Sequence, residues 1–409
     1  MQDRASKRAL DAVAAAAMFV FGVVVALLGA VMPILSERLS IGLGEVATLF
    51  LAMNGAMLAA SLIVGPSMDR FGMKAPLALG VLLAGLSLAM VAVAPGFGAL
   101  LGAVACLGFG GGIINAGANT LVADLHDDPD AKAAALNLLG VFYGIGALLL
   151  PFGVGMLVAR VGLAALLFSA AALCLATGLF ALALRFPAAK QAQGWPIARA
   201  GRFLRMPFVL ALAFLLFFES GNEFVLGGYF TTYVTQGLAV APAPASYALT
   251  AYWAAILVAR LVLARGLLAR VGAHTAVAAG ALLALVGALA VAAAPSLPVA
   301  AAGIVLTGLA LAAVFPTVLG IAGARFPEHS GTVFGILFTV ALTGGMTMPW
   351  LAGNLAARAG LRVVFVLVAV NFAAIALLNA VARRHAATPP GREAGRASAG
   401  PVPTAAARR

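Results

Sequence analysis

The chain has 409 residues, of which 64% are hydrophobic and only 9% are charged, and its mean hydropathy is +1.10. Soluble globular domains carry about 25% charged residues, so this composition excludes a water-soluble fold and indicates a membrane protein. The formal net charge of +12 is explained below by the orientation of the chain in the membrane, which excludes a nucleic-acid-binding surface as its cause.

Apolar stretches recur along the whole chain. About twenty helical residues cross the ~30 Å hydrocarbon core of a bilayer. Because lipid offers the backbone no hydrogen-bond partners, the spans must be helices or closed barrels, and long Ala, Leu, Val and Gly runs without alternation favour helices. The first apolar run is too long for a cleaved signal peptide, so it is interpreted as a retained helix. The predicted fold is all-α with twelve transmembrane spans: 10–35, 45–68, 75–94, 98–123, 133–158, 163–185, 207–235, 245–264, 274–293, 298–324, 330–357 and 362–382.

The loop after the second span reads GPSMDRFGMK, residues 65–74. Its glycines permit a tight turn, and Asp69 can pair with an Arg or a helix end on the facing half of the molecule. The loop resembles the signature of the major facilitator superfamily, which implies two six-helix halves and transport by alternating access. The alternative is an ordinary basic loop that only sets orientation. The residues expected to gate transport are Gly65, Asp69, Arg70, Gly72 and Lys74.

Two stretches carry a more specific resemblance: GFGGGIINAGANTLVADL at 108–125 and AALNLLGVFYGIGALLLP at 134–151. They resemble the fourth and fifth helices of the fucose–galactose–glucose permease family. The seventh span and residues 308–338 are similar to the same family. The resemblance implies a sugar or polyol as the solute and proton symport, with Asn115, Asn119 and Asn137 among the residues that bind the solute.

The chain departs from that family at two places. The fucose-permease branch has acidic residues in its first and fourth helices, but the first span here has no acid in its core. Gly29 stands where the first of these acids is expected. In the fourth span, Asn115 precedes Asn119 by four residues where the branch has Glu. Proton coupling is therefore expected to depend on another acid.

Segments near the start recur about 200 residues later. VAVAP at 91–95 recurs as VAAAP at 291–295, and Arg70, Phe71 and Gly72 recur as Arg270, Val271 and Gly272. Such parallel repeats place the solute between the halves, near the middle of the membrane. The predicted domains are an N-terminal half (1–185), a basic central loop (186–206), a C-terminal half (207–382) and a disordered tail (383–409).

Lys and Arg are distributed very unevenly between the two sides of the membrane. Twenty of them fall in loops and tails on the side of the two termini, against only Arg38, Arg160, Arg358 and Arg362 on the other side. Because basic loops stay in the cytoplasm, both termini are predicted to be cytoplasmic in a cell inner membrane.

The seventh span contains two acidic residues in mid-membrane, Glu219 and Glu223. Together with Asn222 they follow the spacing of one helical face, and Glu219 lies ~18 Å from the start of the span. An unpaired carboxylate at that depth is costly, so it should face a wet cavity or a partner. Arg260 is expected nearer the cytoplasm, where it reaches the membrane surface. Glu223, with Glu219, is predicted to carry the coupled proton, and the alternative is a neutral packing role.

Polar and aromatic residues within the spans complete the predicted binding site. Amides bind hydroxylated ligands and aromatic faces stack on sugar rings, although amides also join transmembrane helices to each other. Because these candidates include no Lys or Arg, a small neutral solute is expected. The predicted solute-binding residues are Asn115, Asn119, Asn137, Tyr143, Glu223, Tyr229, Tyr252 and Trp253.

No motif for catalysis, a cofactor or a metal is recognised, so the chain is not expected to be an enzyme. The acidic loop at 126–130 is interpreted as solvated rather than as a metal site. A monomer is expected. Two alternatives stay open: an exporter of drugs or metabolites from the same superfamily, and a membrane sensor that transports nothing.

Overall fold

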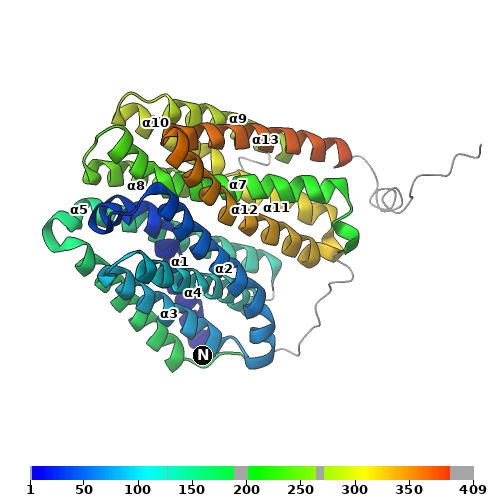
Figure 1. The fold of residues 1–409 in the computed structure, drawn as a ribbon. Helices are drawn as coiled ribbons and strands as arrows, with labels where there is room; N and C mark the ends of the chain where they lie inside the picture. Colours follow the sequence, from blue (N-terminus) through cyan, green and yellow to red (C-terminus); the bar gives the residue numbers. More distant parts are fainter. Residues whose placement is uncertain (1, 127, 188–200, 264–270, 387–409) are drawn as a thin grey trace, which may run out of the picture.

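The computed structural model describes residues 2–126, 128–187, 201–263 and 271–386. These residues form helices and short connections (Figure 1). The helices of the first half are α1 (Gln2–Leu39), α2 (Leu43–Phe71), α3 (Lys74–Val93), α4 (Phe97–Leu125) and α5 (Pro129–Ala183). Those of the second half are α7 (Pro207–Thr232), the π-helical turn η1 (Tyr233–Gly237), α8 (Pro242–Leu263), α9 (Ala273–Ala292), α10 (Leu297–Leu311), α11 (Val314–Arg325), η3 (Pro327–His329), α12 (Ser330–Ala359) and α13 (Arg362–Ala386).

Eleven helices within the described ranges are long and apolar enough to cross a membrane. One of them, α5, holds two spans, because the backbone at Gly162 leaves the helical region with φ 79° and ψ 160°. Glycine adopts a positive φ without the clash that a Cβ would cause. With α5 counted as two spans, and α10 and α11 together as one, the all-α fold has the twelve spans that the sequence predicts.

The predicted connecting segments are described only in part. Residues 201–203 of the predicted central loop are helical, and 188–200 lie outside the described residues. The last helix continues to Ala386, past the predicted start of the tail at 383, and the rest of the tail lies outside the described residues. Figure 1 shows α1–α5 forming one bundle and α7–α13 forming the other.

The repeat is visible in the backbone itself. Six described residues have a positive φ, and they form three pairs: Ser40 with Ala239, Gly72 with Gly272, and Gly162 with Gly360. The members of each pair lie 199, 200 and 198 positions apart, as the sequence repeat predicts. Because a positive φ is uncommon in non-glycine residues, its recurrence at Ser40 and Ala239 indicates that the same turn has been built twice.

The outer helices expose large apolar side chains that a soluble protein would bury. Leu79 and Leu86 on α3 are 62% and 60% exposed, and Leu282 on α9 and Leu377 on α13 are 56% and 66% exposed. An apolar surface of this kind fits a hydrocarbon environment and not water. The chain is therefore a multi-pass membrane protein.

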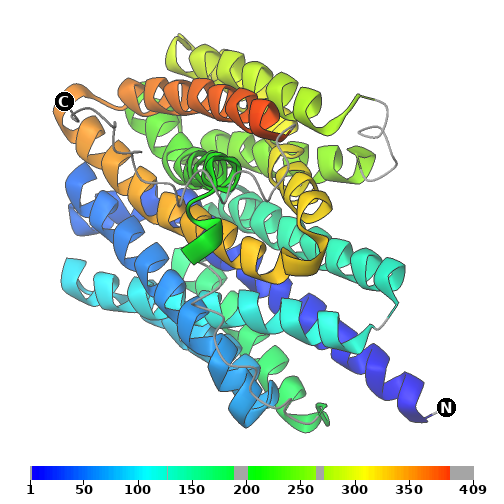
Figure 2. The ribbon, with the colours of Figure 1, turned by 90° about the vertical axis from the view of Figure 1, so that its right-hand side faces the viewer.

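The two ends of the bundle differ in how closely the halves approach. We call the end with the beginning of α1 and the end of α13 the terminal end, and the opposite end the far end. α1 packs on α7, α2 on α12 and α5 on α8. Figures 1 and 2 show α2 and α12 side by side at the far end and diverging towards the terminal end. The halves are thus closed against each other at the far end.

Candidate functional site

A hydrogen bond joins the two halves near the middle of the bundle. The hydroxyl of Tyr143 on α5 donates to Oε1 of Glu223 on α7 over 3.0 Å. Glu223 is half-buried, and its helix passes close to α1 of the other half. The structure thus brings two of the predicted site residues together across the interface. Their assignment to solute binding and proton coupling remains a prediction.

Aromatic rings and one cation surround Tyr143. Its ring lies 5.5 Å from that of Phe21 and 6.3 Å, edge to face, from that of Trp253. The guanidinium carbon of Arg260 lies 6.0 Å from the Tyr143 ring centroid, which is at the outer limit of a cation–π contact. The sequence predicts that Arg260 reaches the membrane surface and that no cation lies among the binding residues. The structure instead places the half-buried Arg260 against Tyr143, one of the predicted binding residues.

Several polar atoms near this centre are buried without a partner among the described groups: Glu219 Oε2, Tyr252 Oη and Trp253 Nε1. Glu219 is only 1% exposed and lies one helical turn from Glu223 on α7. No described carboxylate lies within ion-pair distance of Arg260. The centre therefore holds two carboxyl groups one helical turn apart and one cation, all in a region where charge is poorly solvated.

Asn222 does not share the orientation of Glu223. Its Nδ2 donates to the Val368 carbonyl over 3.3 Å, and its Oδ1 accepts from Nδ2 of Asn371 over 2.9 Å, both on α13 of the same half. The polar face that helical spacing predicts is therefore divided. Asn222 joins helices within the C-terminal half, while Glu223 meets the N-terminal half.

The three predicted asparagines lie in two places. Nδ2 of Asn119 donates to the backbone oxygen of Asn115 over 2.8 Å and contacts Sδ of Met18 on α1 at 4.0 Å. Asn137 is exposed on α5, between Tyr143 and the terminal end. Asn119 therefore lies where α4 packs on α1, and neither Asn115 nor Asn119 has a described hydrogen bond to Tyr143 or Glu223.

Tyr229 belongs to the far-end closure. It is fully buried, its hydroxyl donates to the Pro349 carbonyl over 2.9 Å, and its ring lies 5.1 Å from that of Phe50 on α2. This position lies between the α2 and α12 helices of the two halves. From this position, Tyr229 can affect a solute only by changing how the far end closes.

Glycines set the closest approach of the two halves. A Cβ added to Gly29 would overlap the carbonyl oxygen of Gly227, so α1 and α7 cross backbone to backbone. The hydroxyl of Thr231 also donates to the Gly29 carbonyl. This explains the departure at Gly29 noted from the sequence, because no acidic side chain fits there while the far end is closed.

Most of the predicted gating loop is helical, because α2 continues to Phe71, so the turn itself is shorter than the 65–74 loop that the sequence predicts. Gly65, Asp69 and Arg70 lie outside the residues whose surroundings the structure describes. α2 ends at Gly72, which has φ 80° and whose N–H donates to the Met68 carbonyl over 2.9 Å, and α3 begins at Lys74. The predicted tight turn is present.

The sequence of this chain matches the model of a known protein family. The model of the Major Facilitator Superfamily matches residues 14–221 and 212–408. The chain belongs to this superfamily. Its members are membrane transporters, as the sequence resemblance predicts for this chain. No curated protein matches the sequence.

Solved structures of major facilitator proteins share the fold along the whole chain. One is a bacterial homolog of the human lysosomal transporter Spinster, in an inward-facing and unoccupied conformation. It is 16% identical, covers 98% of this chain and 99% of its own, and has a TM-score of 0.72. The Escherichia coli fucose:proton symporter is 18% identical, with coverage of 91% and 98% and a TM-score of 0.64. The human organic anion transporter TETRAN is 19% identical, with coverage of 93% and 100% and a TM-score of 0.64.

Sequence reasoning missed the contribution of two residues to this region. Phe21 packs on Tyr143, and Arg260 lies over the same ring. Phe21 is an ordinary apolar residue in an apolar span, so nothing in the sequence marks it. Arg260 is an unusual residue for a span, but its depth in the sequence predicts a side chain that reaches the membrane surface. Only the packing of α8 on α5 shows that it lies against Tyr143.

Proposed function

We propose that this protein is a proton-coupled secondary transporter of a small neutral solute, such as a sugar or polyol. The observation that carries the proposal is the bond from Tyr143 to Glu223, since it joins the halves through an ionisable group. An ionised Glu223 accepts a charge-assisted hydrogen bond, which is stronger than a neutral one. Protonation weakens that bond and allows the halves to separate, which links proton uptake to alternating access.

The remaining site residues extend this proposal. Trp253 packs edge to face on Tyr143, and Tyr252 packs on Trp253, so both buried rings support Tyr143, while Asn137 offers an exposed amide on α5. With both termini in the cytoplasm of an inner-membrane protein, the far end faces outward, and this conformation is closed towards the outside. The segment from Gly65 to Lys74 acts as the gate at the cytoplasmic side. One chain holds both halves, so the monomer is the transporting unit.

Glu223→Gln tests the coupling. Glutamine keeps the shape and accepts the Tyr143 hydrogen bond but cannot titrate. In proteoliposomes with a solute panel, the variant should lose accumulation driven by a pH gradient while counterflow exchange continues at about the normal rate. Glu45→Gln is the matched control and should keep normal accumulation, because Glu45 accepts from the Gly42 N–H at the far end, away from the centre. If Glu223→Gln still concentrates the solute, Glu223 is not the coupling group.

The position of Arg260 favours a second candidate, a solute that carries a carboxylate. Its half-buried guanidinium has no carboxylate partner among the described residues and lies beside the aromatic groups of the site. Guanidinium groups recognise carboxylates through paired hydrogen bonds.

Arg260→Gln separates the two solute classes. Uptake of a sugar and of its matched sugar acid should be compared in the same proteoliposomes. A neutral solute predicts that sugar uptake changes by about twofold or less, whereas an anionic solute predicts a loss of acid uptake of about tenfold or more. Arg160→Gln, beside the break in α5 at Gly162, serves as the control for a simple loss of positive charge.

A further inference from the structure

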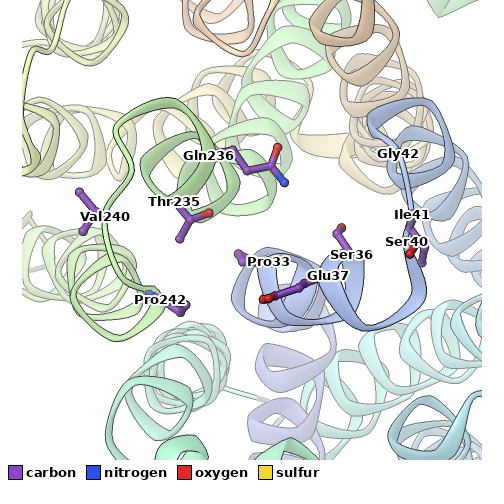
Figure 3. Close-up of a pocket in the computed structure, with 10 residues that line it drawn as sticks. All are labelled: Pro33, Ser36, Glu37, Ser40, Ile41, Gly42, Thr235, Gln236, Val240 and Pro242. Atoms are coloured by element: carbon purple, nitrogen blue, oxygen red, sulfur yellow. The ribbon is translucent and has the colours of Figure 1, made fainter.

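A cavity that is open to solvent on one side lies at the far end, between equivalent parts of the two halves. Its volume is about 510 Å³, within the range of sites that hold small molecules. One wall is the end of α1 and the connection to α2, including Ser36 and Glu37. The facing wall is η1 and the connection to α8, including Thr235 and Gln236. Figure 3 shows these four side chains around a common space.

The four polar residues are related by the internal repeat. Ser36 and Thr235 lie 199 positions apart, as do Glu37 and Gln236, and this is the offset of the positive-φ pair Ser40 and Ala239. Each half thus contributes a hydroxyl followed by a carboxyl or its amide. The cavity has matched hydrogen-bonding walls with a single negative charge, from Glu37.

The Ser36 hydroxyl beside the cavity lacks a hydrogen-bond partner among the described groups. The Ser36 side chain is only 7% exposed. Buried hydroxyls are almost always hydrogen-bonded, so an orphaned one beside a cavity points to a ligand. Thr235 donates to the Thr231 carbonyl over 2.9 Å, which leaves its oxygen free to accept.

The charge of Glu37 is available to a ligand. The neighbouring Arg38 turns away and donates to the Ala92 carbonyl over 3.0 Å and to Ala94 over 3.3 Å, at the end of α3. No described cation lies within ion-pair distance of Glu37. Gln236 lies in a π-helical turn, a distortion that is frequent at functional sites.

We propose that this cavity is a second binding site, separate from the central one, for a small amine that also carries hydroxyl groups. Its ammonium group binds the Glu37 carboxylate, and its hydroxyls bond to Ser36, Thr235 and Gln236. Because it contacts both halves, the bound amine holds the far end closed and favours the present conformation.

Binding of labelled glucosamine to the purified full-length protein tests the charge requirement. Glu37→Gln should weaken binding about tenfold and Ser36→Ala several-fold. Glu45→Gln is the matched control, because Glu45 lies at the same end but accepts from the Gly42 N–H over 2.9 Å, as glutamine can. Glu45→Gln should bind like the wild type, and N-acetylglucosamine should compete poorly. Equal binding to the wild type and Glu37→Gln, or no saturable binding, would overturn the proposal.

Hydrogen exchange separates this site from the central one. Glucosamine should slow exchange of the amides of residues 225–240 in the wild type and in Glu223→Gln, but not in Glu37→Gln. If Glu223→Gln abolishes the protection while Glu37→Gln keeps it, the amine binds centrally and the far-end site is excluded.

Discussion

The far end and the centre of the interface join the same two halves by different means. At the far end, the backbones of α1 and α7 touch because Gly29 and Gly227 have no side chains. At the centre, a hydrogen bond from Tyr143 to Glu223 joins the halves, beside the ring contact of Tyr143 with Trp253. Close packing weakens sharply once the helices separate by even a small distance, because dispersion forces fall steeply. A bond to an ionisable group can instead be strengthened or weakened by a proton. We infer that backbone packing at the far end holds the halves closed, and that the protonation state of the central hydrogen bond controls when they separate.

Gly29→Ala should have the largest effect, because it breaks the far-end contact directly. The added methyl overlaps the Gly227 carbonyl oxygen, so the far end cannot close and transport should fall about ten- to a hundredfold. Labelling of a cysteine introduced at Ser36 should become faster in the variant. Gly102→Ala is the control, because nothing lies within 4 Å of its added Cβ. Normal transport by Gly29→Ala would show that the crossing is not the closure.

Tyr143→Phe should have an intermediate effect, since it removes only the central bond. The ring contacts to Phe21 and Trp253 remain, but Glu223 loses its donor. We expect accumulation in a pH gradient to fall several-fold while the far end still closes. Tyr233→Phe is the matched control, because it removes a bond over 3.0 Å to the Val291 carbonyl within one half. Equal losses in both variants would mean that the central bond has only a structural role.

Asn371→Ala should leave transport nearly unchanged and affect stability instead. It removes the 2.9 Å bond to Asn222 inside the C-terminal half and leaves that amide oxygen without a donor. A loss of about 1 kcal/mol is expected, seen as a lower midpoint of thermal unfolding in detergent. Asn354→Ala, whose exposed amide bonds only to its own helix, should shift the midpoint less. A coupling defect in Asn371→Ala would extend the central site to α13.

The fold could be predicted from the sequence because every span in lipid must be apolar and must satisfy its own backbone hydrogen bonds. Apolar length and the repeat predict twelve helices in two halves. The break in α5 at Gly162 falls between the predicted spans 133–158 and 163–185, and Gly360 has the same positive φ in the second half. The boundary of the last helix was less accurate, because Arg383 and Arg384 extend the helix beyond the apolar run.

The site was harder to predict because it depends on contacts between distant segments. Tyr143 and Glu223 are both predicted solute-binding residues, and the structure joins them by a hydrogen bond across the halves. Helical spacing could not show that Asn222 turns towards α13, nor that Gly29 meets Gly227. The far-end cavity could have been found from the pairs Ser36–Thr235 and Glu37–Gln236, which the repeat relates. Aligning these pairs requires the offset of 199 residues, which only the positive-φ residues Ser40 and Ala239 reveal.

The lengths of the outer helices have a consequence for the surrounding bilayer. α3 and α9, equivalent in the two repeats, each have 20 residues, or about 30 Å of helix, which matches the hydrocarbon thickness of a typical membrane. The interface helices α1 and α12, with 38 and 30 residues, are longer than this. Rocking of the halves changes the tilt of the outer pair and hence the hydrophobic mismatch at the rim of the protein. The thickness of the host bilayer thus becomes a variable of the transport cycle, with thinner membranes favouring the conformer in which α3 and α9 are most tilted.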